Sequence, residues 1–319
     1  MYSNDVYRYG RRAAGIFIII CIALLLHSCS DDSDLAVQMD ADNSRISNYL
    51  AENSISAVRD GSGVYYEVLE TNPQGEAVNN DDVLSIAYSI KTLDGELLEE
   101  SYDSASTLIF HNFQSVVPIG LDYGLDLMRV GEKFRFYIPS TLAYNSYSNS
   151  LFETSTNFIA EVTLLSIQSK TDIYNQELNL IRNYLYQEQV IDNGDAYQQD
   201  LFYREVEKGT GKAPNSSSTV SINFTRKYLN GTIIERTNSS PVTFQLNTGQ
   251  AVEGLEMGIL KMQEGGKAML VMPSKLGFGE SLQVIPKKIR TDLLRENLIY
   301  STVAPFTPLI YDVELVKVQ

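Results

Sequence analysis

Hydrophobic and polar residues alternate over several short stretches of this chain. Val220, Ile222 and Phe224 alternate with serine, asparagine and threonine, and this period of two predicts a half-buried β-strand. The dipeptides Asp94-Gly95 and Asn230-Gly231 are typical of tight hairpin turns. We therefore expect antiparallel strands joined by short turns.

Two other stretches have the period of a helix. In the first, Leu121, Leu125 and Met128 are spaced at i, i+4 and i+7, so their side chains share one face. The same spacing recurs in the second stretch, at Leu255, Ile259 and Met262. A glycine follows each stretch, as is typical of a helix C-terminus. One short helix packed on antiparallel strands predicts an α+β fold.

The same order of elements occurs twice along the chain. Residues 83–88 (VLSIAY) align with residues 219–224 (TVSINF) at an offset of 136 residues. Further along, residues 161–165 (EVTLL) align with residues 312–316 (DVELV) at an offset of 151. This self-similarity predicts a tandem duplication, and the longer offset predicts an insertion in the second copy, near residues 281–301.

The N-terminal 28 residues have the pattern of a secretory signal. Three arginines precede an apolar run from Ala13 to Leu26, which is shorter than the roughly 20 residues that span a bilayer. The run ends in Leu26-His27-Ser28-Cys29, which resembles the bacterial lipobox. That resemblance implies cleavage before Cys29 and lipidation of its thiol. An ordinary secretory signal with an incidental cysteine is the alternative.

The chain between the signal and the duplication is acidic. Residues 29–45 lack periodicity, which predicts a flexible tether. Its acidic residues resemble the surface-export signal of Bacteroidetes lipoproteins, and a plain spacer is the alternative. We assign the two copies to residues 46–169 and 170–319, each beginning with a predicted helix, at residues 44–59 and 172–189.

Charge and composition limit the chemistry of the chain. Its 319 residues carry a formal net charge of −15, which disfavours binding to nucleic acid. The sequence has neither a His/Cys cluster with metal-ligand spacing nor a Gly-rich phosphate loop. We therefore expect no metal and no cofactor.

The second copy resembles the FKBP family of peptidyl-prolyl cis-trans isomerases. A strand ending in an aromatic residue (SINFT) precedes a turn (NGTIIERT), the motif GQAVEGLEMG, a Gly-x-Lys, a proline after a strand, and a final YDVEL. The first copy follows the same frame in a degenerate form. The resemblance covers nearly all of the chain from about residue 80. It implies two tandem FKBP-like domains, each a curled antiparallel sheet around one short helix.

The resemblance also implies a substrate pocket in each copy. In the second copy the expected residues are Phe224, Ile234, Glu235, Phe244, Val252, Leu255, Phe278, Val303 and Tyr311. In the first, weaker copy they are Tyr88, Leu98, Glu99, Phe110, Val117, Leu121, Tyr144 and Ala160. The alternatives are a plain hydrophobic core for the apolar residues and solvated strand positions for the two glutamates.

An isomerase needs such a pocket because amide resonance gives X-Pro rotation a barrier of about 18–20 kcal/mol. The twisted transition state has lost that resonance and is less polar than the planar ground state, so an apolar pocket favours it. The family also holds the substrate carbonyl with a backbone N–H, expected near Val252 and Val117, and with a tyrosine hydroxyl.

Neither copy has the complete set of family residues. Leucine replaces the tryptophan of the pocket floor in both copies. The hydroxyl-bearing tyrosine is Tyr144 in the first copy but Phe278 in the second. The closing aromatic residue is Tyr311 in the second copy but Ala160 in the first. We therefore expect an active second domain and a weaker or inert first domain.

The two resemblances, to the FKBP family and to the lipobox, together imply a membrane-anchored peptidyl-prolyl isomerase that assists the folding of exported proteins. Its partners would be unfolded, proline-containing polypeptides and, through acylated Cys29, the lipid bilayer. The protein would be located in the cell envelope, where it would be lipid-anchored in the outer membrane on the periplasmic or the surface face. The alternatives are a catalytically weak FKBP-like binding or chaperone module and, last, a structural adhesin. The insertion near residues 281–301 either gates or extends the substrate groove, or is a surface helix.

Overall fold

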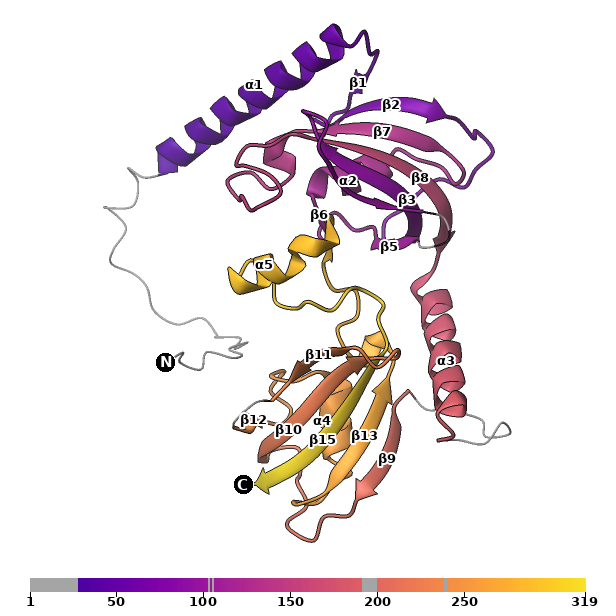
Figure 1. Cartoon of the computed structure of the whole chain (residues 1–319), viewed down its shortest axis with the longest axis vertical. Helices are drawn as coiled ribbons and strands as arrows, with labels where there is room; N and C mark the ends of the chain where they lie inside the picture. Colours follow the sequence, from indigo (N-terminus) through magenta and orange to yellow (C-terminus); the bar gives the residue numbers. More distant parts are fainter. Residues whose placement is uncertain (1–27, 103, 105, 191–199, 238–239) are drawn as a thin grey trace. The chain divides into compact units, whose positions relative to one another are not determined.

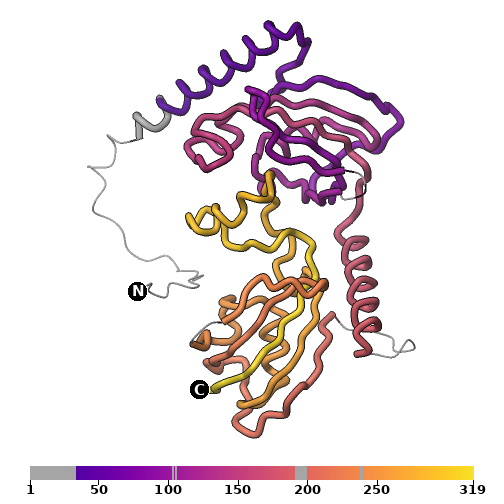
Figure 2. The backbone as a smooth tube through the Cα atoms, viewed as in Figure 1, coloured from indigo at the N-terminus to yellow at the C-terminus, as the bar shows by residue number. Residues whose placement is uncertain are grey.

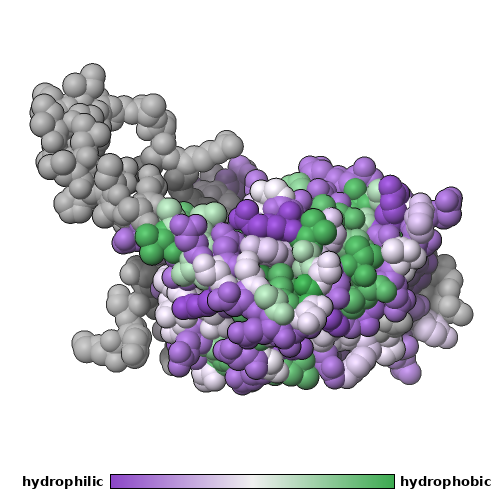
Figure 3. All heavy atoms as spheres, turned by 90° about the horizontal axis from the view of Figure 1, so that it is seen from above, coloured by the Kyte–Doolittle hydropathy of each residue, from purple (hydrophilic) through white to green (hydrophobic). Residues whose placement is uncertain are grey.

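The computed structural model describes residues 28–102, 104, 106–190, 200–237 and 240–319. Most of the predicted signal segment lies outside these residues. Within them, no helix combines the length and the hydrophobicity that are needed to cross a membrane. On the face shown in Figure 3, hydrophobic residues form several separate patches between hydrophilic ones.

The first domain is built on an antiparallel sheet of seven strands, with the order β1-β2-β7-β8-β3-β4 and β5 paired to β3 (Figure 1). The strands are β1 (Val58–Arg59), β2 (Tyr65–Glu70), β3 (Val83–Thr92), β4 (Leu97–Ser101), β5 (Thr107–Phe110), β7 (Lys133–Ile138) and β8 (Phe158–Gln168). Helix α2 (Ile119–Leu125) contacts β7. The 3-10 helix η2 (Ser140–Leu142) follows β7.

The second domain repeats this plan with six strands, in the order β11-β10-β15-β13-β9 and with β12 paired to β10. The strands are β9 (Phe202–Glu207), β10 (Thr219–Tyr228), β11 (Ile233–Arg236), β12 (Val242–Gln245), β13 (Lys267–Met272) and β15 (Leu309–Val318). Helix α4 (Glu253–Ile259) contacts β13, and η3 (Ser274–Leu276) follows β13. The predicted α+β fold, with two tandem curled sheets around short helices, is confirmed.

Glycine lets the short helix of each domain approach its sheet closely. A Cβ atom at Gly258 would lie 2.4 Å from Leu270 Cδ1, and one at Gly124 would lie 2.7 Å from the Phe136 ring. Both distances are too short for carbon atoms, so neither position accepts a side chain without movement. The repeated glycines of GLDYG and GLEMG therefore set the depth of the core beneath α2 and α4.

A longer helix precedes each sheet. Helix α1 (Ser28–Glu52) packs Ile46 against the first domain, and α3 (Lys170–Gln187) packs Ile181 against the second. The flexible tether predicted for residues 29–45 is wrong, because these residues belong to α1. The reason is tertiary: Asp42 is fully buried and accepts hydrogen bonds from Ser140 Oγ at 2.7 Å and Thr141 N at 3.2 Å.

The second domain has an equivalent contact between its preceding helix and its 3-10 helix. Glu177 of α3 is buried and accepts hydrogen bonds from both the backbone N and Oγ of Ser274, each at 2.7 Å. Burial raises the pKa of Glu177, although the hydrogen bonds from Ser274 oppose this effect. In both domains, an acidic residue of the preceding helix thus accepts hydrogen bonds from the start of a 3-10 helix, η2 after β7 or η3 after β13.

The insertion lies within the sequence of the second domain but belongs to the compact unit of the first. The chain divides into two compact units, and residues 282–302 belong to the unit of the first domain, whereas residues 171–281 and 303–319 form the other. Figure 2 shows this segment as a loop that projects from the rest of the second domain's backbone. It contains β14 (Gln283–Val284), the 3-10 helix η4 (Lys287–Ile289) and α5 (Arg290–Arg295). Its Ile285–Pro286 peptide bond is cis.

Candidate active sites

In the second domain, one hydrophobic cluster contains all of the apolar residues predicted for the pocket. Alternate residues of a strand face the same side of a sheet. Accordingly, Phe224 of β10 and Tyr311 of β15 both face the cluster that holds α4, with ring centroids 5.8 Å apart. The other predicted residues in this cluster are Ile234, Phe244, Val252, Leu255, Phe278 and Val303. Of these, Ile234, Val252 and Phe278 are only partly buried, as is Phe224.

A buried arginine lies among these residues. Arg226 Nη2 is 2.6 Å from Glu235 Oε2, and Nη1 donates to the Tyr311 hydroxyl at 3.2 Å. The guanidinium carbon is 4.7 Å from the centroid of the Phe278 ring, which is a cation–π distance. The sequence analysis missed Arg226. The sequence alone could have identified it. Arg226 lies two residues after Phe224 on the same strand, so the two side chains face the same side of the sheet.

The equivalent positions of the first domain are apolar. In the strand register, Ile90 pairs with Ala160, where Arg226 pairs with Tyr311 in the second domain. The predicted residues Tyr88, Leu98, Leu121 and Ala160 are buried in one cluster. The Tyr88 hydroxyl donates a hydrogen bond to Glu99, which lies opposite Ile90. The first domain therefore has the carboxylate of Glu99, as the second has that of Glu235, but Ile90 stands where the second domain has the paired cation Arg226.

Tyr144 and Val117 complete the first groove. The Tyr144 ring is buried, and the Val117 side chain packs on the same cluster. Burial raises the pKa of Tyr144 well above its usual range. Burial and then the hydrogen bond to Glu99 raise the pKa of Tyr88 as well. Both phenols therefore keep their protons and act as hydrogen-bond donors.

Phe110 does not lie in the groove. Ile109 pairs with Leu84 in the first domain, as Phe244 pairs with Val220 in the second. Ile109, not Phe110, is thus the counterpart of Phe244, and it belongs to the core cluster. Because side chains alternate along β5, Phe110 faces the other side, where Lys170 Nζ lies 4.8 Å from its ring centroid.

The two domains also differ at the residue that precedes the short helix. Val252 precedes α4, whereas Pro118 precedes α2, so the counterpart of Val252 is Pro118 rather than the predicted Val117. Proline has no backbone N–H. Among the residues that the structure describes, none accepts a hydrogen bond from the Val252 N–H. Only the second domain therefore has a backbone donor at this position.

Comparison with known proteins decides the family. Residues 74–165 and 210–316 match the model of the FKBP-type peptidyl-prolyl cis-trans isomerase family. This chain belongs to the FKBP family. The two matched segments correspond to its two FKBP domains.

Two relatives and one solved structure illustrate the similarity. The chloroplastic isomerase FKBP16-3 of Arabidopsis thaliana is 32% identical over 117 residues, which are 36% of this chain and 47% of that protein. The probable isomerase FkpA of Neisseria meningitidis serogroup B is 28% identical over 120 residues, which are 37% and 38% of the two chains. The aligned region thus spans less than half of either relative. The crystal structure of the three FKBP domains of wheat FKBP73 covers 83% of this chain and 99% of its own, at 16% identity and a TM-score of 0.32.

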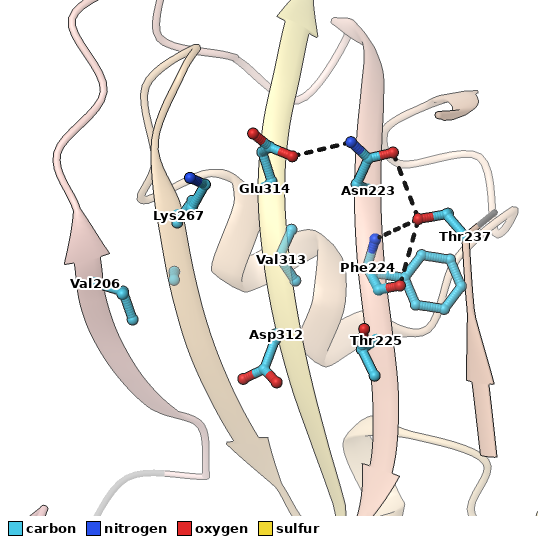
Figure 4. Close-up of a pocket in the computed structure, with 10 residues that line it drawn as sticks. Val206, Asn223, Phe224, Thr225, Thr237, Lys267, Asp312, Val313 and Glu314 are labelled. Carbon is cyan, nitrogen blue, oxygen red and sulfur yellow. Dashed lines mark hydrogen bonds between the residues drawn. The ribbon is translucent and has the colours of Figure 1, made fainter. Parts of the chain in front are cut away.

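A separate hollow of about 430 Å³ lies on the outer face of the second FKBP domain's sheet (Figure 4). Asn223 Nδ2 donates to Glu314 Oε2 at 2.9 Å there, and helix α4 lies behind the strands. Of the predicted pocket residues, only Phe224 borders this hollow, and most of its lining is polar or charged. It is therefore distinct from the inward-facing pocket. Among the described residues, no three His, Cys, Asp or Glu side chains are grouped to hold a metal ion.

Proposed function

We propose that this FKBP chain is a peptidyl-prolyl cis-trans isomerase acting on unfolded, proline-containing polypeptides, and that its second domain carries the main active site. Family membership supports the reaction. The observation that carries the choice of domain is the Val252 N–H, which no described residue accepts, against Pro118, which has none.

In this proposal, the second pocket acts by differential binding of the twisted amide. The substrate proline packs against Phe224 and Leu255, and the Val252 N–H donates to the substrate carbonyl oxygen. The hydrogen bond fixes the carbonyl while the prolyl nitrogen rotates out of conjugation. Because the twisted amide is less polar than the planar one, the apolar wall favours it, and no nucleophile or proton transfer is needed.

Arg226 has a positioning role in this account. Its guanidinium contacts the Phe278 ring, and its charge is balanced by Glu235, so the floor carries no net charge. The family's tyrosine hydroxyl is missing at Phe278. A hydrogen bond contributes about 1 kcal/mol, which corresponds to roughly a fivefold change in rate, so this domain should be a slower isomerase than a domain with the complete set.

The test is isomerisation of short Xaa-Pro peptides by the full chain and by its Val252→Pro variant. Val252 has φ −68°, which suits proline, so the substitution removes the N–H without forcing the backbone. We expect kcat/KM to fall about fivefold, with the Tm unchanged. An unchanged kcat/KM in a folded Val252→Pro variant contradicts the proposal.

The matched control is the reverse exchange, Pro118→Val, in the first domain. The exchange gives this domain the backbone N–H that it lacks, and a Tm equal to that of the unaltered chain is the check that the variant folds. We expect no gain in the activity of the full chain. A gain that matches the loss in Val252→Pro would assign the activity to both domains.

We further propose that the protein is exported, cleaved before Cys29 and lipid-anchored in the outer membrane of the cell envelope, where it assists the folding of exported proteins. The support is the apolar run followed by Leu26-His27-Ser28-Cys29. The test is fractionation of cells that express the full chain or its Cys29→Ser variant. We expect the full chain in the membrane fraction and the variant outside it. Equal membrane association of the two contradicts the anchor.

A further inference from the structure

The groove of the first FKBP domain holds a segment of the same chain. Gln283 and Val284 form a parallel pair of strands with Val116 and Val117 (β6). Gln283 N donates to Ser115 O at 2.7 Å, and Ile285 N donates to Val117 O at 2.9 Å. The segment is thus bound as an added strand, a common way in which proteins recognise extended peptides.

Predicted site residues bind the next part of the segment. The Tyr144 hydroxyl donates to the carbonyl oxygen of Ile285 at 2.6 Å, and Ile285 directly precedes Pro286. Glu99 Oε2 accepts a hydrogen bond from Lys287 N at 2.7 Å. Polar contacts therefore hold both sides of an Ile-Pro pair, and the tyrosine holds the carbonyl that precedes the proline.

Burial and charge support the same arrangement. Val284 and Ile285 are fully buried, and Ile289 and Leu293 nearly so, in the cluster that contains Tyr88 and Leu121. Residues 281–302 contain four basic and two acidic residues, in a chain whose net charge is −15. The segment thus combines buried apolar side chains with a net positive charge, in a protein whose net charge is negative.

We propose that the first domain is a binding site for extended segments with a β-branched residue before proline, and that residues 283–287 are its resident ligand. While this ligand is bound, its backbone and side chains occupy Val117, Tyr144 and Glu99, so external peptides are excluded. The first domain then acts as an internal clamp, and unfolded substrates reach the second domain. The inference does not depend on isomerase activity in either domain.

The test uses a fluorescent peptide with the sequence of residues 281–290, SLQVIPKKIR, and the full chain. A release variant, Val284→Asp with Ile285→Asp, places two charges where the segment is buried. The control, Lys288→Asp with Thr291→Asp, places them at exposed positions of the same segment. We expect the release variant to bind the peptide at least tenfold more tightly than the control and the unaltered chain. Adding Tyr144→Phe to the release variant should weaken that binding about fivefold.

Equal affinity in the unaltered chain and the folded release variant overturns the proposal, as does an affinity that Tyr144→Phe leaves unchanged. Hydrogen exchange on the unaltered chain provides a second measurement in case the release variant does not fold. We expect the Gln283 and Ile285 amides to be as protected as those of strand β3. Exchange at the rate of an unstructured peptide overturns the resident ligand.

Discussion

At equivalent positions of the two sheets, the first FKBP domain pairs Ile90 with Ala160, and the second pairs Arg226 with Tyr311. The first pair belongs to a floor on which Val284 and Ile285 of the insertion are buried. The second pair joins an aromatic ring to a cation that Glu235 balances. The same fold thus supports a groove that holds a fixed segment and a groove whose floor contains an arginine–glutamate ion pair and a hydrogen bond to Tyr311.

The two domains also differ in the backbone residue that precedes the short helix. Pro118 leaves the first groove without a donor, but the Val117 carbonyl accepts the Ile285 N–H. Val252 leaves the second groove with a donor for a substrate carbonyl. Loss of the donor and occupation by the chain's own segment therefore coincide in the first domain. The proposed division of labour places binding in the first domain and catalysis in the second, and the following predictions test the structural differences between the two domains.

The largest effect is expected at a buried pair that only the first domain has. His111 Nδ1 lies 2.8 Å from Asp122 Oδ1, and both side chains are fully buried. The counterpart of His111 in the second domain is Leu246. We expect His111→Leu to destabilise the first domain by about 3 kcal/mol, because it leaves the buried Asp122 carboxylate without its imidazole partner and, among the described residues, with only the Phe113 N–H donating to it. Denaturant unfolding measures the loss, and an unchanged second-domain transition is the control.

The same pair makes stability depend on pH. Burial lowers the pKa of His111, but the hydrogen bonds and charges of Asp122 and Asp126 outweigh it and raise the pKa above 6.5. Because the folded pKa exceeds the unfolded value, this stabilisation is complete below about pH 6.5 and is lost as the pH rises through the folded pKa. Unfolding of the first domain between pH 6 and 9 should show this loss, and His111→Leu should abolish it.

A smaller effect is expected from the acidic residues of the two preceding helices. Asp42→Ala removes two hydrogen bonds to the first domain, and Glu177→Ala removes two to the second. Because hydrogen bonds to charged groups contribute about 1.5–3 kcal/mol, each variant should lose about 2 kcal/mol in its own domain only. Thermal unfolding with probes in each domain checks this. A loss in the opposite domain would contradict the assignment of each helix to its sheet.

The smallest effect is expected from exchanging the two floors. Arg226→Ile places the equivalent residue of the first domain into the second. It removes the contact with Phe278, the hydrogen bond to Tyr311 and the ion pair between buried Arg226 and partly exposed Glu235. We expect a loss of about 1 kcal/mol in the unfolding free energy of the second domain. The control is Lys227→Ala, which removes only the ion pair with Asp312 on the outer face and should cost less. A larger loss in the control would contradict the buried role of Arg226.

Local patterns were enough to predict the fold, and the apolar residues predicted for the second pocket lie in one cluster. The period of two, the helical spacing and the self-similarity of the chain predicted two α+β domains, and the family motifs led to Phe224, Leu255 and Tyr311. Phe110 was misplaced because a shift of one residue reverses the face of a strand, and the hairpin before β5 hides that shift in the alignment.

The remaining errors concern contacts between residues far apart in sequence. Residues 29–45 have the composition of a tether, but the burial of Asp42 against Ser140 depends on the 3-10 helix η2, about a hundred residues away. The contacts of the insertion are likewise between residues far apart in sequence, since Ile285 accepts a hydrogen bond from Tyr144 of the first domain. Arg226 was missed because an ion pair on the inward face makes a charged residue compatible with burial.

The central claim, that the second groove acts on external substrates while the first is occupied, is tested most directly at one pair of equivalent positions. Isomerisation of an Xaa-Pro peptide should be measured with the full chain and its Phe224→Leu and Tyr88→Leu variants. The account predicts that kcat/KM falls about fivefold for Phe224→Leu, through loss of an aromatic contact of about 1 kcal/mol, and is unchanged for Tyr88→Leu. A fall for Tyr88→Leu with full activity in Phe224→Leu would contradict it.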